Sequence, residues 1–321
     1  MRPIAVVVAT RDRGGKVVRL IESVLANGQQ NFEMVIVDQS TGDQTEAAVA
    51  PFLDDPRIRY MRSSESGVSC GRNLGISMTT APLIAITDDD CIVPSDWLTG
   101  IATTFDSQPR VGVVFCTVDA VPVDAPGLTP TIHFDHNRVI DSVFMAWRFS
   151  GGGLALGAGM ALRRATFDDV DGFDELLGPG ARFGACEDND LSWRALIAGW
   201  WTYQNSEVVV IHDGFRNLEE LRILVVRDFF GVGGAIAKYL RTGNLRILRL
   251  LIVWIVRFGL VEPGRDVIAG RRPRGLRRPY LLMRGLLAGL RTPMNRSQRV
   301  YLANSHCRSR PVDATTRRYT G

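Results

Sequence analysis

The stretch Leu83-Ile84-Ala85-Ile86-Thr87-Asp88-Asp89-Asp90 joins an apolar run directly to three carboxylates. Its apolar half predicts a buried strand. Adjacent like charges repel one another, so a loop selected for stability alone would seldom hold three of them. A divalent cation changes that balance, because hard cations such as Mg²⁺ take carboxylate oxygens and bridge them to phosphates. The triplet is therefore either a solvated acidic turn or part of a metal site, and the rest of the chain has to distinguish the two.

Short apolar runs alternate with helical patterns through the first hundred residues. Strands are predicted at 4–9, 34–37, 58–61 and 83–86, and helices at 17–25 and 71–80. This alternation predicts an α/β fold with a doubly wound sheet, in which function lies at the carboxyl ends of the strands. Polar clusters follow three of the strands: Thr10-Arg11-Asp12, Asp38-Gln39-Ser40 and Asp88-Asp89-Asp90.

Later segments extend the same pattern. Residues 111–123 and 208–211 predict further strands, and a helix is predicted after Glu187. The glycine-rich stretch 151–159 cannot form a regular helix and predicts a loop.

The net charge of +4 hides a strong asymmetry along the chain. Residues 1–215 hold 16 Lys and Arg against 28 Asp and Glu, whereas residues 216–321 hold 22 against 6. We therefore expect an acidic region that needs a cation and a basic region that seeks an anionic surface. The hydrophobic fraction of 45% supports a packed core and argues against a disordered protein.

The basic region is predicted to be helical. Arg246, Arg249 and Arg257 project within an arc of about 80° on an otherwise apolar helix at 245–260. Three arginines in this span argue against a helix that crosses a membrane. The helix either lies in a membrane interface or packs on the first region with its arginines in water, and both alternatives stay open.

A second basic cluster follows this helix. Arg271-Arg272-Pro273-Arg274, with Arg277-Arg278 close behind, favours anionic lipid head groups or nucleic acid. The segment from about Cys307 has little apolar content and is predicted to be disordered.

The cysteines and the first residues bear on the location of the protein. The five cysteines form no CxxC pair, and their odd number favours reduced thiols in a cytosolic protein over a disulfide framework. Residues 1–8 lack the apolar core and the cleavage site of a signal peptide. These features predict a cytoplasmic protein, with its basic region available to the inner face of the cell membrane.

A site for a nucleoside diphosphate needs groups that bind the base, the ribose and the phosphates. Asp38 could accept hydrogen bonds from a base N–H or a ribose hydroxyl, or it could form a turn. Arg72-Asn73 opens a predicted helix, where a guanidinium suits a phosphate or the aspartate cluster. The alternative for Arg72 is an ordinary surface position.

A second acidic cluster, Cys186-Glu187-Asp188-Asn189-Asp190, precedes the helix that carries Arg194. Acidic residues stabilise the N-terminus of any helix through its dipole. A carboxylate beside a cation-bound phosphate could instead deprotonate an incoming hydroxyl. His212, at the end of a predicted strand, is either a metal ligand or a structural histidine.

These elements, in this order, resemble the family 2 glycosyltransferases of the GT-A fold. The resemblance runs from residue 4 to about residue 212. Each segment alone is weak, but six in the family's order and spacing are specific. The segments are 7–13, 35–40, 67–75, 88–90, 157–161 with 172–175, and Glu187-Asp188 with Arg194.

The resemblance implies an inverting, nucleotide-sugar-dependent glycosyltransferase. Residues 1–215 would form the catalytic domain, with a mostly parallel sheet flanked by helices. Residues 216–321 would form a basic helical extension that could associate with a membrane. The donor would be a nucleotide-diphosphate sugar that supplies a hexosyl or deoxyhexosyl group. The acceptor would be a saccharide or lipid-linked molecule in polysaccharide or glycolipid synthesis, and no nucleic acid is expected as a partner.

The resemblance also implies roles for individual residues. Asp188 would be the general base, with Glu187 beside it. Asp90, Asp89 and His212 would hold Mg²⁺ or Mn²⁺, and either Asp89 or Asp90 is the principal ligand. The nucleotide would be bound by Thr10, Arg11, Asp12, Asp38, Arg72, Asn73 and Asp88. Gly159 and Arg194 would lie on the acceptor side.

The chain departs from the family's motifs in its first two segments. Ala9 replaces the usual Pro, Arg11 an aromatic residue and Asp12 an Asn. Gln39 stands where a second Asp is common, which leaves Asp38 to act alone.

Two rival functions fit parts of the sequence. A sugar-phosphate nucleotidyltransferase of related fold should carry a glycine-rich basic loop after the first strand, for which Gly14-Gly15-Lys16 is short. A protein that binds nucleic acid or another anionic surface should interleave aromatic residues with its arginines, and few are present beyond Tyr280.

Overall fold

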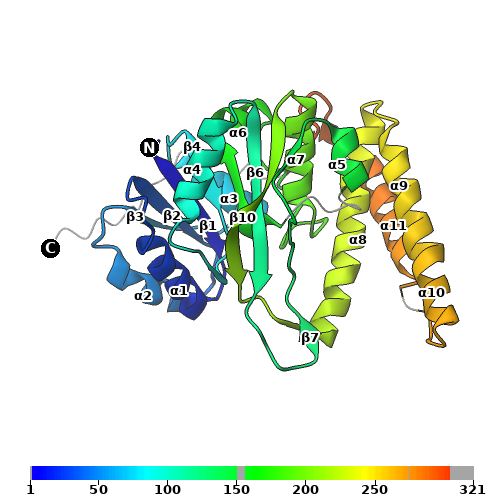
Figure 1. Cartoon of the computed structure of the whole chain (residues 1–321), viewed down its shortest axis with the longest axis horizontal. Helices are drawn as coiled ribbons and strands as arrows, with labels where there is room; N and C mark the ends of the chain where they lie inside the picture. The colour runs from blue at the N-terminus through cyan, green and yellow to red at the C-terminus, as the bar shows by residue number, and fades with distance from the viewer. Residues whose placement is uncertain (1, 150–155, 274, 304–321) are drawn as a thin grey trace.

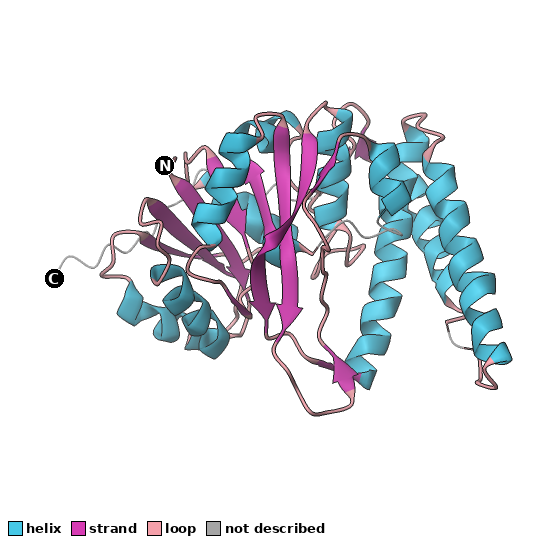
Figure 2. Cartoon of the chain, in the orientation of Figure 1, coloured by secondary structure: helices cyan, strands magenta, loops and turns pink. Residues whose placement is uncertain are grey.

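The computed structural model describes residues 2–149, 156–273 and 275–303. A nine-stranded sheet lies at its centre, with the order β3-β2-β1-β4-β9-β6-β10-β5 and β8 paired with β10 (Figures 1 and 2). The predicted α/β fold is confirmed. The strands of this sheet are β1 (Ile4–Thr10), β2 (Phe32–Asp38), β3 (Ile58–Arg62), β4 (Leu83–Ile86), β5 (Cys91–Ile92), β6 (Val111–Ala120), β8 (Arg138–Ile140), β9 (Met160–Arg163) and β10 (Trp201–His212).

Helices cover both faces of the sheet because its strands are apolar on both sides. In β1, Ile4 and Val6 belong to the same hydrophobic cluster as residues of α1 (Gly14–Leu25) and α4 (Trp97–Ser107). Ala5 and Val7 belong to a second cluster with residues of α3 (Val68–Ser77) and α7 (Glu187–Ile197). This alternation is the period of two that a strand imposes on its side chains. Shorter helices are α2 (Gln44–Val49), α5 (Val143–Phe149) and α6 (Arg164–Asp169).

The direction of the strands brings the polar clusters to one edge of the sheet. β1 is parallel to β2 and β4, and its last residue, Thr10, pairs with Asp38. Val7 pairs with Ile86, so the aspartate triplet after β4 lies at the same edge as Thr10. On the other side, β9 runs antiparallel between β4 and β6, while β6 and β10 are parallel to each other.

Two predicted segments differ in extent from the structure. β10 spans Trp201–His212, because residues 201–205 pair with β6 before the part that its apolar run predicted. Of the predicted loop at 151–159, residues 151–155 lie outside the described residues, and Gly157–Gly159 form a short 3₁₀ helix.

The C-terminal region forms a layer of helices beyond α7 (Figure 1). These are α8 (Leu218–Arg241), α9 (Ile247–Val256), a π-helical turn (Arg257–Val261), α10 (Glu262–Ile268) and α11 (Arg278–Arg291). The Phe183 ring stacks on those of Phe230 and Tyr301, with centroids 5.6 and 5.0 Å away. Residues of this layer share one hydrophobic cluster with the sheet and α7, so the layer packs directly on the rest of the protein.

Buried ion pairs link this layer to α7. The Lys238 ammonium on α8 is fully buried, 2.6 Å from an Asp174 oxygen and 2.8 Å from an Asp190 oxygen. Asp190, on α7, also pairs with Arg194 at 2.9 Å. The backbone N–H of Tyr301 donates to Asp174 at 2.9 Å. Charges removed from water need such complete pairing, because a single unpaired member would be costly.

The predicted helix at 245–260 combines features of both alternatives left open by the sequence. In α9, Leu250 and Trp254 are buried against the protein. Ile252 and Val253 are 59% and 44% exposed on the same helix. The helix therefore packs on the protein and also presents aliphatic side chains to its surroundings.

The remaining expectations concern thiols and membrane spans. Cys91, Cys116 and Cys186 are buried free thiols, as predicted, but Cys70 is disulfide-bonded, so the expectation of reduced thiols is wrong for that residue. Within the described ranges, the helices are too short or too polar to cross a membrane. The tail predicted to be disordered, from about Cys307, lies outside the described residues.

Candidate active site

A cavity of about 650 Å³ opens where the carboxyl edge of the sheet meets the N-terminus of α7. One wall follows β1 and β4 and includes Thr10, Arg11, Arg13 and the aspartate triplet. Glu187 and Asp188 line it from α7, and His212 lines it from the end of β10. The opposite wall comes from the C-terminal layer: Leu224, Arg227, Asp228, Val232 and Trp254.

Asp89 is engaged by residues at the end of β1 and in the turn that follows it. The Thr10 hydroxyl donates to one carboxylate oxygen at 2.7 Å, and an Arg13 guanidinium nitrogen donates to the other at 2.9 Å. The same Arg13 nitrogen donates to Asp90 at 3.0 Å. Arg13 therefore compensates two adjacent carboxylates, which reduces the repulsion within the triplet.

Asp90 is the member of the triplet that lies against His212. Its Oδ1 is 3.2 Å from His212 Nε2, and Pro130 O lies 3.1 Å from Nδ1. Burial raises the pKa of Asp90, but His212 and Arg13 outweigh burial and bring it to about 2. Burial lowers the pKa of His212, but the hydrogen bond and charge of Asp90 raise it by more, so the net change is a rise. Asp90 is therefore ionised at neutral pH.

The donor atoms around Asp90 can be tested against a divalent cation. Asp90, Cys91 and His212 each place a possible ligand atom within 4.8 Å of the others. Carboxylate and imidazole suit Mn²⁺, whereas a thiol is a soft ligand. Burial also raises the pKa of the Cys91 thiol, so it stays protonated. Asp90 and His212 fit a Mn²⁺-like ion, and Cys91 does not.

Arg72 connects the sheet edge to α7. Its guanidinium is buried and donates to Asp88 at 2.9 Å and to Glu187 at 3.1 Å. Gly157 makes room for it, because a Cβ there would lie 2.7 Å from an Arg72 nitrogen. Asp88 is the most exposed of the triplet, with 36% of its side chain accessible beside the cavity.

Glu187 and Asp188 are adjacent buried carboxyls at the N-terminus of α7. Burial and the charge of Asp188 raise the pKa of Glu187 to about 7, although Arg72 opposes them. Burial also raises the pKa of Asp188, while hydrogen bonds from Asn189 and the charge of Arg72 act against it. Asp188 accepts from the Asn189 backbone at 2.6 Å, which orients its carboxylate. A base with a raised pKa is well matched to proton transfer near neutral pH.

Five of the predicted site residues lie away from the cavity lining. Asp12 is exposed, and its backbone N–H donates to Ser40. Asp38 is fully buried and accepts from the Ser40 backbone at 2.8 Å and from the Tyr60 hydroxyl at 2.6 Å. Its position therefore has the character of the turn-forming alternative.

The other three residues hold the surrounding structure together. Asn73 exchanges hydrogen bonds with the Phe173 backbone, both at 2.9 Å. Arg194 forms a buried ion pair with Asp190 within α7. Gly159 is buried against Cys116 and Val118. Neither residue predicted for the acceptor side lines the cavity.

Sequence reasoning gave no role to several residues that line the cavity. Arg13 lies in the first motif and directly follows the polar cluster after β1, so its position in the sequence did indicate that it belongs to the site. The residues of α8 and α9 carry no local signal, since an Arg-Asp pair in an apolar helix is an ordinary surface pattern.

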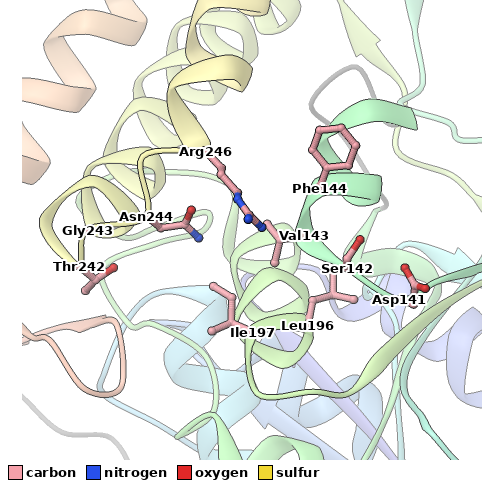
Figure 3. A pocket seen from close by; sticks show the side chains of 10 residues that line it. All are labelled: Asp141, Ser142, Val143, Phe144, Leu196, Ile197, Thr242, Gly243, Asn244 and Arg246. Atoms are coloured by element: carbon pink, nitrogen blue, oxygen red, sulfur yellow. The ribbon is translucent and has the colours of Figure 1, made fainter.

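A second cavity of about 440 Å³ lies near the opposite end of α7 (Figure 3). It is lined by Leu196 and Ile197 from that end of the helix and by residues of α5 and the α8–α9 connection. Figure 3 shows Arg246 extending toward Val143 across it. None of the predicted site residues lines this cavity, so the chemistry concentrates in the larger one.

Comparisons with known sequences agree with the motifs. The model of the family described as Glycosyl transferase family 2 matches residues 5–171, slightly more than half of the chain. An uncharacterized glycosyltransferase of Rickettsia felis is 31% identical over 93 residues, which are 29% of this chain and 15% of that protein. Succinoglycan biosynthesis protein ExoO of Rhizobium meliloti is 32% identical over 126 residues, 39% of this chain and 36% of that protein. The chain thus spans only 15% and 36% of the length of these curated relatives.

Solved structures share the architecture. The mannosyltransferase PcManGT from Pyrobaculum calidifontis, in complex with GDP-Man and Mn²⁺, has a TM-score of 0.60 at 16% identity, covering 90% of this chain and 87% of that one. Residues 1–349 of TarS from S. aureus give a TM-score of 0.61 at 16% identity, covering 83% and 74%. At this identity the likeness shows the fold. The family match, the motifs and the shared fold together establish that the chain belongs to glycosyl transferase family 2 and has the GT-A fold.

Proposed function

We propose that the protein is an inverting glycosyltransferase that moves a hexosyl or deoxyhexosyl group from a nucleotide-diphosphate sugar to an acceptor hydroxyl. The observation that carries this proposal is the position of Asp188, an oriented carboxylate in the same cavity as the aspartate triplet. The sheet edge supplies arginine side chains that could bind a diphosphate and carboxylates that could hold a metal, and α7 supplies a base for a hydroxyl.

Residues at the sheet edge would bind the donor. Thr10, Arg11 and Asp88 line the cavity there, and the glycosyltransferase neighbours include complexes with GDP-Man, UDP and UDP-GlcNAc. Asp90 and His212 would hold a divalent metal, which supplies positive charge to the leaving nucleoside diphosphate when bound. Arg72 would keep Asp88 and Glu187 at fixed positions on either side of the sugar.

Asp188 would act on the acceptor. The acceptor oxygen attacks the anomeric carbon from the face opposite the diphosphate, its proton passes to Asp188, and the bond from carbon to the diphosphate oxygen breaks. A single displacement of this kind inverts the configuration at that carbon. The pKa of Glu187 is raised to about 7, so this carboxyl is partly ionised at neutral pH, and its negative charge would make Asp188 a stronger base.

The decisive test is substitution of Asp188. Asp188→Asn should lower the rate of sugar transfer by about 10² to 10⁴-fold, the usual contribution of a positioned base. The variant should still bind the nucleotide sugar, which thermal shift measures with and without Mn²⁺. Asp54→Asn, at an exposed position, is the matched control. Full transfer activity in the Asp188 variant would remove this residue from the proposed role.

We also propose that residues 216–321 bring the catalytic domain, residues 1–215, to an anionic membrane surface at the cytoplasmic face, where it would act in polysaccharide or glycolipid synthesis. Leu260 and Ile268 are 69% and 89% exposed in the C-terminal layer. Exposed arginines accompany them, among them Arg257 and Arg265. Aliphatic side chains next to cationic ones suit the boundary between acyl chains and anionic head groups.

A further inference from the structure

The wall that faces the sheet edge belongs to the C-terminal layer. Arg227 and Asp228, neighbours on α8, line the same cavity as Asp188. If the sheet edge takes the nucleotide, as proposed above, an acceptor must approach Asp188 from this other side. Resting on that function, we propose that Arg227 and Asp228 bind hydroxyl groups of a saccharide acceptor.

The backbone around residue 184 makes room for this pair. Gly184 has a φ of +73°, and a Cβ there would lie 2.3 Å from Arg227 Cγ. Only glycine satisfies both conditions without strain. The aliphatic part of Arg227 therefore lies directly against the loop that leads to Glu187, which fixes its position relative to the catalytic helix.

Arg227 and Asp228 keep capacity for a ligand. Their closest approach, from Arg227 Nε to an Asp228 oxygen, is 3.4 Å, which is long for a charged hydrogen bond. Their side chains are 35% and 43% exposed. A guanidinium has five N–H donors and a carboxylate accepts at two oxygens, so two long contacts, both to the same Asp228 oxygen, leave most of them available.

The chemistry of the pair matches vicinal hydroxyl groups. A hydroxyl both donates and accepts, so a carboxylate and a guanidinium side by side can bind two adjacent hydroxyls of one sugar ring. Val232 and Trp254 add an apolar surface for the C–H face of that ring. Trp254 is held in place by Phe229 and Phe258, with ring centroids 5.3 and 5.4 Å away.

The alternative occupant of Arg227 is the diphosphate of the donor. Asp228 argues against it, because a carboxylate next to the guanidinium repels phosphate oxygens. Asp228 is also close enough to Glu187 to feel its charge: burial raises the pKa of Asp228, Arg227 opposes this, and Glu187 adds to the rise. The pair thus faces the catalytic carboxyls, and a neutral, hydroxyl-rich ligand fits this environment better than an anion.

The experiment separates acceptor binding from donor binding in the full-length protein. Arg227→Met and Asp228→Asn are compared with Arg222→Met and Glu219→Gln, which change exposed residues of α8 outside the cavity lining. Two rates are measured with one nucleotide sugar and Mn²⁺: hydrolysis in the absence of acceptor, and transfer to a panel of octyl glycosides. Hydrolysis reports that each variant is folded and binds the donor.

We expect the KM for the best octyl glycoside to rise by roughly 10- to 100-fold in each cavity variant, the loss expected for a hydrogen bond to a charged group. The rate of hydrolysis in the cavity variants should stay within about twofold of the unmodified protein, since these variants keep every contact to the donor. Both rates in the control variants should also stay within about twofold. An unchanged acceptor KM overturns the inference. Equal losses of hydrolysis and transfer also overturn it, because Arg227 would then act on the donor.

The remaining outcomes separate the inference from the function on which it rests. Hydrolysis without transfer to any octyl glycoside would contradict a saccharide acceptor and leave the donor site intact. Failure of the unmodified protein to bind or hydrolyse any nucleotide sugar would refute the proposed function itself, and the acceptor assignment would fall with it.

Discussion

The two walls of the large cavity differ in how the chain specifies them. The wall at the sheet edge follows β1 and β4, whose pairing brings Thr10 and the aspartate triplet together. The wall on α8 and α9 depends on Lys238, buried between Asp174 and Asp190, and on aromatic stacking around Phe183. A local sequence pattern thus encodes the first wall, whereas only tertiary packing encodes the second.

The largest expected effect is a loss of stability when Lys238 is replaced. Lys238→Met leaves the buried Asp174 carboxylate without its cation and Asp190 with Arg194 alone, so we expect the free energy of unfolding to fall by about 3–5 kcal/mol. Urea denaturation measures it. The chain's other lysine provides the control, because the Lys16 side chain is 39% exposed and its ion pair should contribute about 0–1 kcal/mol. Similar small losses in both variants would mean that the buried pairs do not hold the second wall.

The sheet edge can be tested by separating its two adjacent aspartates. We expect Asp90→Asn to weaken Mn²⁺ binding in the presence of UDP or GDP by about 100-fold or more, as loss of a direct ligand should exceed loss of a supporting contact. Asp89→Asn, the matched variant, should cost less than about 10-fold, because Thr10 and Arg13 already occupy Asp89. Calorimetric titration measures both. The reverse order would make Asp89 the principal ligand.

Glu187 and Asp188 lie between the two walls, and the pH dependence of kcat/KM tests how they interact. In the proposed role of Asp188 as general base, the ionised form is the active one, so kcat/KM should rise with pH through its raised pKa and fall below it. Glu187→Gln removes a like charge and frees Arg72, and both changes favour ionised Asp188. The acid limb of the pH profile, measured at constant saturation with Mn²⁺, should therefore move to lower pH. A limb that stays in place would show that the two carboxyls do not titrate as a pair.

The smallest expected effect concerns the outer side of the C-terminal layer. Arg271→Glu and Arg272→Glu should each weaken binding to vesicles that contain phosphatidylglycerol by about 1 kcal/mol. Flotation measures the bound fraction, with phosphatidylcholine vesicles for comparison. Arg110→Glu, an exposed arginine on the loop before β6, is the control. Equal binding by all variants would contradict an electrostatic attachment through this cluster.

The sequence predicted the fold and the sheet edge because their signals are local. The apolar run of β1 and the apolar run before Asp88 both follow from neighbouring residues. The same reasoning could not predict which partners a side chain would contact. Asp38 and Asn73 lie in the expected motifs, yet they form hydrogen bonds with Tyr60 and with the Phe173 backbone.

The residues predicted for the acceptor side show the limit of reasoning from neighbouring residues. Arg194 was assigned there from a motif, but its partner Asp190 belongs to the network around Lys238, on the other side of α7. Arg227 and Asp228 reach the cavity only because α8 folds back against α7. No spacing within α8 predicts that contact, since it depends on residues far away in the chain.

The network around Lys238 has a consequence for the order of events during synthesis. Asp174 and Asp190 emerge from the ribosome well before Lys238, and Tyr301 follows later still. Until then, burial would leave the Asp174 carboxylate without a cation and Asp190 with Arg194 alone, which is unfavourable. A nascent chain can therefore form the strands at its N-terminal end early, while the helix that carries Asp188 has to await the synthesis of Lys238 and Tyr301. Under the proposed function, a chain that stops before Lys238 would therefore lack a properly placed Asp188 and would transfer no sugar.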